Sequence, residues 1–123
     1  MNNSFLVIAF FGVQHQIKLY HWQTCKYSRH KATDTFLEEI SKQIDTFIEV
    51  YQGKYGRIML NNKHSFVIED LNDDNAPNYL ESFRKFLVED IEQWLSPKDT
   101  DLYNIRDEML SLTNQTLYLF TLS

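Results

Sequence analysis

Apolar side chains recur at helical spacing in four separate stretches, and this pattern constrains the fold of the chain more than any other feature. Only three glycines and two prolines interrupt the 123 residues, so few points can break a helix. The predicted helices cover residues 4–26, 29–55, 77–95 and 99–120. We therefore predict an all-α fold, a four-helix bundle that occupies residues 1–123 as one domain.

The connections between these helices decide the predicted topology. The first two helices are separated by Tyr27 and Ser28, with Ser28 as a candidate N-cap, and the last two are separated at Pro97. Residues 57–75 form a much longer connector without a helical period. A helix of about 25 residues is roughly 37 Å long, and about twelve extended residues cover that length.

The connector can therefore travel the whole length of the bundle, so that the second and third helices run in the same direction. That path gives the ferritin-like arrangement, in which two antiparallel hairpins are joined by one long B–C crossover. The alternative is an up-and-down bundle in which the same residues form a slack surface loop.

The charge of the chain argues against nucleic acid as a partner, because the formal net charge is −5 and neither end carries a basic arm.

The apolar run over residues 5–13 lacks the flanks of a targeting signal and is too short to span a bilayer. We interpret it as the buried start of a helix. A single cysteine, Cys25, excludes an internal disulfide and suits a reducing compartment. We expect a cytoplasmic or otherwise intracellular protein, of a cell, a phage or a virus, without a membrane partner.

Side chains of the metal-ligating type lie on one face of the second predicted helix and near the end of the first. The candidate ligands are His21, His30, Asp34, Asp45 and Glu49. Imidazoles combined with carboxylates are the usual protein ligands of iron, manganese and zinc. The alternative interpretation is that this polar stripe is only the solvated face of an amphipathic helix.

The order and spacing of these residues resemble the ferroxidase signature of the Dps miniferritins. In this chain the signature comprises His21-Trp22, His30, Asp34, Asp45 and Glu49. Its last three intervals match the spacing of the family. The resemblance implies a ferritin-like fold, an iron site made of these ligands without separate catalytic residues, and the oxidation and sequestration of ferrous iron. It also implies a site between two subunits, and leaves zinc or manganese open in place of iron.

The chain departs from the family in several respects, and reads as a shortened and divergent member. The link between His21 and His30 is a few residues shorter and lacks the usual glycine. The basic N-terminal tail is missing, so DNA binding is not expected. The short length leaves open whether the chain forms a larger cage. The Glu-x-x-His pair that builds a diiron site within one ferritin bundle is also missing.

Helix geometry predicts that a single chain cannot bring the five ligands to one ion. His21 should face the first turns of the second helix, near His30 and Asp34, whereas Asp45 lies eleven residues beyond Asp34. At 1.5 Å per residue this separation is about 16 Å. A two-fold homodimer with antiparallel second helices would bring Asp45 and Glu49 of one chain to the histidines of the other. The predicted site therefore requires at least a homodimer.

A function of another class competes with this interpretation. The alternative is a ferritin-like subunit that holds no metal and serves as a structural or protein-interaction partner. Dense aromatic residues, among them Phe10, Trp22 and Tyr118, would then build the interface. The fold alone does not decide between the two functions.

Overall fold

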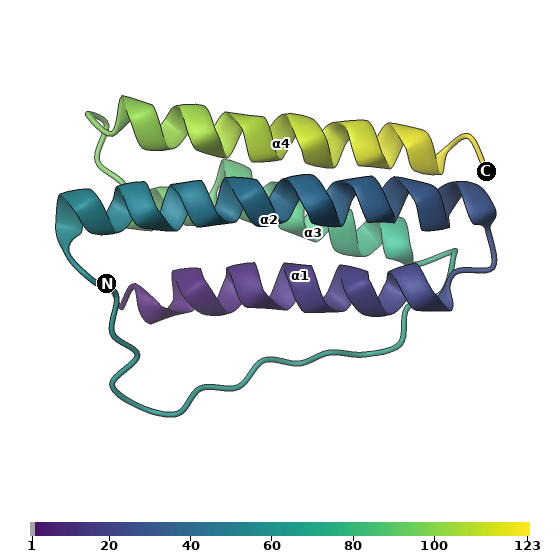
Figure 1. Ribbon diagram of the computed structural model, residues 1–123, viewed down its shortest axis with the longest axis horizontal. Helices are drawn as coiled ribbons and strands as arrows, with labels where there is room; N and C mark the ends of the chain where they lie inside the picture. Colours follow the sequence, from purple (N-terminus) through teal and green to yellow (C-terminus); the bar gives the residue numbers. More distant parts are fainter. Residues whose placement is uncertain (1) are drawn as a thin grey trace.

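The computed structural model describes residues 2–123, and this part of the chain is helical with no strand (Figure 1). Its elements are α1 (Ser4–Gln23), α2 (Tyr27–Tyr55), α3 (Ala76–Val88), the short 3₁₀ helix η1 (Asp90–Trp94) and α4 (Thr100–Phe120). The prediction of an all-α fold with four helices is confirmed.

The three long helices α1, α2 and α4 lie side by side, and α3 lies behind α2 (Figure 1). The chain leaves α2 at the end of the bundle where α1 begins. It then runs along α1 and starts α3 at the opposite end, near the C terminus (Figure 1). As a result α2 and α3 run in the same direction. α1 and α2 form one antiparallel pair, and α3 and α4 form the other. The connector spans the bundle rather than looping at one end.

The core consists of aliphatic and aromatic side chains from all four helices and η1. Its largest fully buried members include Leu6, Phe10, Tyr20, Phe36, Phe47, Leu80, Ile91, Leu102 and Met109. Aromatic rings link the helices, since Phe10 of α1 contacts Phe47 of α2 edge to face with ring centroids 5.6 Å apart. Burial of such side chains provides the main driving force that holds the bundle together.

Three helix ends lie two or more residues from their predicted positions, and two others differ by one residue. The first helix ends at Gln23 rather than at residue 26, since the carboxylate of Asp73 binds the hydroxyl of Thr24 and holds an extended residue there. The second helix begins at Tyr27, with Lys26 rather than Ser28 at the N-cap position.

The third predicted helix, residues 77–95, is divided in the structure. α3 ends at Val88, and η1 replaces its last turns. Arg106 of α4 donates a hydrogen bond of 2.9 Å to the backbone carbonyl of Leu87. This bond gives the carbonyl a partner outside the helix at the point where the α-helix stops.

None of the helices in residues 2–123 is both long and apolar enough to cross a membrane.

Arg29, near the start of α2, fastens one end of the bundle. Only 7% of this residue is exposed. Its guanidinium donates to the hydroxyl of Tyr20 in α1, to the backbone carbonyl of Asp73 in the connector and to the backbone carbonyl of Phe120 in α4. A further bond reaches the hydroxyl of Ser123. One side chain therefore holds α1, α2, α4 and the connector in a fixed relation.

The opposite end is fastened by Asp99, which precedes α4 and is 4% exposed. Its carboxylate accepts hydrogen bonds from the ammonium of Lys54 at 2.9 Å, from the hydroxyl of Tyr55 and from the backbone N–H of Ser96. Burial alone would raise the pKa of Asp99, but these donors stabilise its charge more strongly. The net effect lowers its pKa from 3.8 to about 2.

Replacing Arg29 with lysine should lower the free energy of unfolding by about 2–4 kcal/mol, because each buried acceptor left without its donor costs about 1–3 kcal/mol. Lysine keeps the charge but cannot reproduce the guanidinium fork. Urea denaturation measures the change, and the exposed Arg57→Lys serves as the matched control. A loss no larger than that of the control would show that Arg29 does not fasten the bundle.

Acid should remove the contribution of Asp99 to stability. Its folded pKa of about 2 lies below its ordinary value of 3.8, so the unfolded chain binds a proton that the folded chain does not. The contribution is therefore complete above about pH 5 and is lost as the pH falls through the interval between these two pKa values. Urea midpoints measured from pH 6 to pH 2.5 should fall less steeply for Asp99→Asn than for the wild type, and parallel curves would contradict this.

Candidate metal centre

The turn between α1 and α2 brings two of the predicted ligands together. His21 lies in the last turn of α1 and His30 in the first turns of α2, and their imidazole rings stack with centroids 3.9 Å apart and planes inclined by 17°. Tyr27 extends the stack, since its ring lies 6.5 Å from that of His30 at 23°. Two imidazoles are thus adjacent at this end of the bundle.

Hydrogen bonds determine which ring nitrogen of each histidine carries the proton. Nδ1 of His30 lies 2.9 Å from the backbone carbonyl of His21, and a carbonyl only accepts, so this nitrogen is the donor. Nδ1 of His21 lies 2.8 Å from the hydroxyl of Thr33. That hydroxyl gives its own proton to the backbone carbonyl of Arg29, and it therefore accepts from His21. Both neutral imidazoles consequently carry their lone pair on Nε2.

This pattern fits the requirements of histidine metal ligands. Such ligands usually donate the proton of one ring nitrogen to a protein oxygen, which fixes the ring and leaves the other nitrogen for the metal. Within residues 2–123, neither Nε2 takes part in a hydrogen bond. The same contacts also have a structural role, because His30 satisfies a carbonyl near the C-terminal end of α1.

The surroundings of His21 keep it neutral. The residue is 6% exposed, and burial lowers the pKa of its imidazole. Positive charge on His30 and Lys18 lowers this pKa further, whereas the carboxylate of Asp34 opposes the shift. The net pKa lies below 6.5, so the imidazole is available as a neutral donor at neutral pH.

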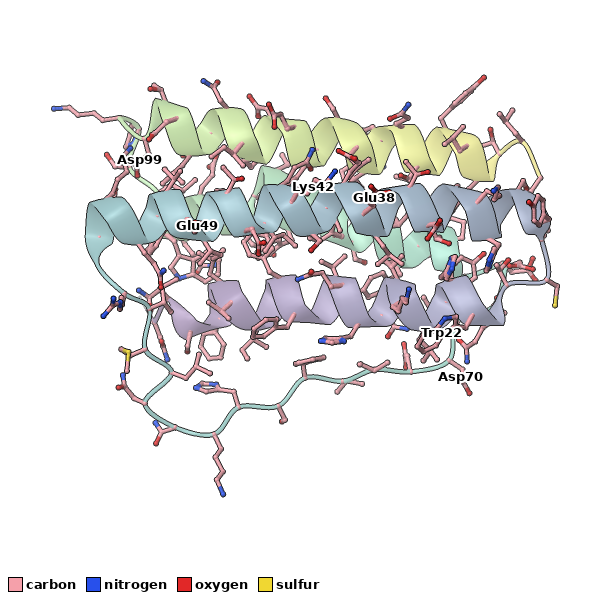
Figure 2. All side chains as sticks on the ribbon, in the orientation of Figure 1. Trp22, Glu38, Lys42, Glu49, Asp70 and Asp99 are labelled. Carbon is pink, nitrogen blue, oxygen red and sulfur yellow. The ribbon has the colours of Figure 1, made fainter. Side chains whose placement is uncertain are left out.

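The other two predicted ligands lie elsewhere along α2. Asp45 and Glu49 are exposed, and Glu49 lies in the half of the bundle opposite to Trp22 (Figure 2). Together they border a groove of about 270 Å³ between α1 and α2. Its other lining residues are Val7, Phe10, Phe11, Gln14, Ile44 and Ile48. Two carboxylates therefore flank a largely apolar depression on the α1–α2 face.

The five predicted ligands thus form two groups in one chain. His21, His30 and Asp34 lie near the α1–α2 turn, whereas Asp45 and Glu49 lie about 16 Å farther along α2 at 1.5 Å per residue. Within residues 2–123, no three histidine, cysteine, aspartate or glutamate side chains are arranged so that they could hold one metal ion. A complete coordination shell therefore needs ligands from outside the chain.

Sequence reasoning missed two residues of this site. Thr33 sets the tautomer of His21, and Tyr27 stacks on His30. Thr33 lies three residues after His30 and Tyr27 three residues before it, so both lie one helical turn from His30. This spacing is the one sequence feature that could have identified them as part of the site. Two other side chains of the metal-ligating type are placed differently: His15 stacks on Phe66 of the connector, and Cys25 is exposed.

Nuclear magnetic resonance of the imidazole nitrogens tests this arrangement. At pH 7.5 both His21 and His30 should be in the Nδ1–H form, and His21 should titrate below pH 6.5 because burial disfavours its charge. Since the unfolded chain then binds the extra proton, stability should decline as the pH falls through about 6.5. An Nε2–H form of His21 in the wild type would contradict the assigned hydrogen bonds, and a pKa of His21 above 6.5 would contradict the effect of burial.

Comparison with known proteins places most of this fold within a recognised family. A family model described as a family of unknown function (DUF5856) matches residues 21–120, from His21 to the last residue of α4. No curated protein and no solved structure matches the chain. The matched segment contains all five predicted ligands, the connector and both ends of the bundle. The chain belongs to the DUF5856 family.

Proposed function

We propose that this chain is a ferritin-like, Dps-like subunit that binds ferrous iron at a site shared by two copies and promotes its oxidation. The observation that carries the proposal is the stacked pair of His21 and His30. Hydrogen bonds hold Nδ1 of each ring, and both Nε2 lone pairs remain free. Two imidazoles of defined tautomer, with Asp34 one helical turn beyond His30, supply the donor types of a metal site, and the stacked rings must turn for both Nε2 atoms to reach one ion.

The path of the chain supports a ferritin-like assignment. The connector runs along the whole of α1, and α2 and α3 run in the same direction (Figure 1). A four-helix bundle with one long crossover between two hairpins has this arrangement. We infer the family relationship from this topology together with the order of the five ligands.

The donor set suits iron, with zinc and manganese as close alternatives. Imidazole nitrogens and carboxylate oxygens bind all three divalent ions. The second group, Asp45 and Glu49 of a partner chain, would supply the anionic ligands, while His21 and His30 supply neutral nitrogen. Hard oxygen ligands favour Fe(III) over Fe(II), which makes bound ferrous iron easier to oxidise.

In the proposed reaction ferrous iron is the substrate and dioxygen or peroxide is the oxidant. Each Fe(II) gives up one electron, so the reduction of one peroxide to water consumes two ferrous ions and two protons. The residues of this chain orient the ion. Burial of His21 keeps its ring neutral, and the negative charge of Asp34 acts on that ring.

A second candidate function is a metal-free structural or interaction subunit. Two observations favour it: the described part of one chain lacks a complete ligand group, and large aromatic side chains are exposed near the α1–α2 face. Phe11 is 44% exposed, Trp22 is 68% exposed and Tyr27 is 73% exposed. Protein purified without chelator would then contain no metal, and Fe(II) or Zn(II) would leave its melting temperature unchanged.

Anaerobic titration with Fe(II), followed by addition of peroxide, tests the proposal. The double variant Asp45→Ala with Glu49→Ala should lose at least tenfold in iron affinity and oxidation rate, because it removes the anionic ligands. The matched control is Glu89→Ala with Glu92→Ala, which removes two exposed carboxylates where α3 ends and η1 begins, at the opposite end of the bundle from the histidines. Equal binding and oxidation by the wild type and the ligand variant would eliminate the proposed site.

A further inference from the structure

Four charged residues form a stripe on the outward face of α2. They are Lys31, Glu38, Lys42 and Glu49, and all four are exposed. At 100° per residue they fall within a sector of about 40° on the side of the helix away from the core. Figure 2 shows Glu38 and Lys42 next to each other near the middle of α2, and Glu49 nearer its C-terminal end.

Within residues 2–123 the partners of these charges are weak, and Nζ of Lys31 lies 5.7 Å from the centroid of the Tyr27 ring. Nζ of Lys42 lies 3.7 Å from a carboxylate oxygen of Glu38 and 3.6 Å from one of Glu39. The side chains of Lys42 and Glu38 are 66% and 70% exposed, and such surface pairs contribute little to stability. The charges of the stripe are therefore available to a second molecule.

When the stripe is read from its other end, every charge is replaced by one of opposite sign. Positive, negative, positive and negative residues follow one another at intervals of seven, four and seven residues, which read the same in both directions. An antiparallel second copy of α2 can therefore place Lys31 opposite the partner's Glu49, and Glu38 opposite the partner's Lys42. By two-fold symmetry each of these ion pairs forms twice.

The same register brings the two groups of ligands together. Asp34 lies three residues after Lys31, and Asp45 lies four residues before Glu49, so Asp34 comes opposite the partner's Asp45 to within about 1.5 Å along the axis. His30 then lies at the height of the partner's Glu49. Carboxylates of two chains thus meet beside the histidine pair, where they repel each other unless a cation lies between them.

We infer that a divalent cation gates the assembly of this protein as an antiparallel α2–α2 homodimer. This inference rests on the proposed function, because the cation occupies the same site. The ion pairs select the partner and the register, and the cation neutralises the carboxylates that would otherwise oppose this register. The groove of about 270 Å³ between α1 and α2, with Phe11 and Ile48 in its wall, supplies apolar surface next to these charges.

A register shifted by one helical turn is the main competitor. It would place Asp34 opposite the partner's Lys42 and Lys31 opposite the partner's Asp45, with Glu38 facing its own counterpart. That arrangement needs no cation, because Asp34 and Asp45 each face a lysine of the partner chain. The cation therefore discriminates between two antiparallel pairings of one surface.

Sedimentation velocity of the full chain, with Zn(II) or with a chelator, tests the coupling. Zinc does not change oxidation state, so the result is independent of the ferroxidase reaction. The dimer dissociation constant should fall at least tenfold with Zn(II), because an ion that binds the dimer preferentially must stabilise it.

Calorimetric titration of the same preparation with Zn(II) shows whether the ion binds at all, and so separates failure of the site from failure of the gating. Absence of binding overturns both proposals, whereas binding without a change in association overturns the gating alone.

Charge reversal tests the register. Lys42→Glu should weaken the zinc-dependent dimer at least tenfold, and adding Glu38→Lys should restore it, because the ion pair is rebuilt with opposite polarity. In the shifted register the second substitution cannot rescue the first, since the reversed residue at position 42 still faces Asp34. Glu108→Lys on α4 is the control, and circular dichroism verifies that each variant is folded. A double variant that remains monomeric with zinc would overturn the proposed register.

Discussion

The buried guanidinium of Arg29 is the interaction on which the rest of the structure depends. It lies where α2 begins, and it binds groups in α1, in the connector and at the end of α4. His30 follows it directly, and the hydroxyl of Thr33 donates to its backbone carbonyl. The position of the candidate metal centre is therefore set by the same contacts that hold this end of the bundle together. Loss of Arg29 should disturb the histidine pair as well as the stability of the fold.

The connector has two parts, which differ in how many hydrogen bonds tie them to the helices. At its C-terminal end, Gln16 forms hydrogen bonds with both the backbone N–H and the carbonyl of Glu69, and Asp73 accepts hydrogen bonds from Tyr20 and Thr24. Its earlier part is more exposed, with 84% exposure at Val67. The part that starts α3 is thus fixed by buried polar side chains, so the start of α3 is defined by specific hydrogen bonds and not by apolar burial alone.

Much of the fold could be predicted from the sequence, because apolar periodicity records which face of each helix is buried. Leu6, Phe10 and Ile17 follow that pattern and are fully buried. Helix ends were predicted less well, since Asp73 and Arg106 act on them from distant parts of the chain. The pairing of His21 with His30 follows from their positions on either side of a short turn. Their tautomers could not be predicted, because they depend on the hydroxyl of Thr33 and on a backbone carbonyl.

The central claim is that His21 and His30 share a metal ion with carboxylates from a second copy of the chain. Anomalous diffraction from crystals grown with Zn(II) or Fe(II) tests it most directly. We predict a peak within about 2.1 Å of Nε2 of both histidines, whose rings must turn out of their parallel stack to converge on the ion, with Asp45 or Glu49 of a two-fold-related chain completing the shell. A dimer without an anomalous peak at this position, or a peak held by other residues, would contradict the account.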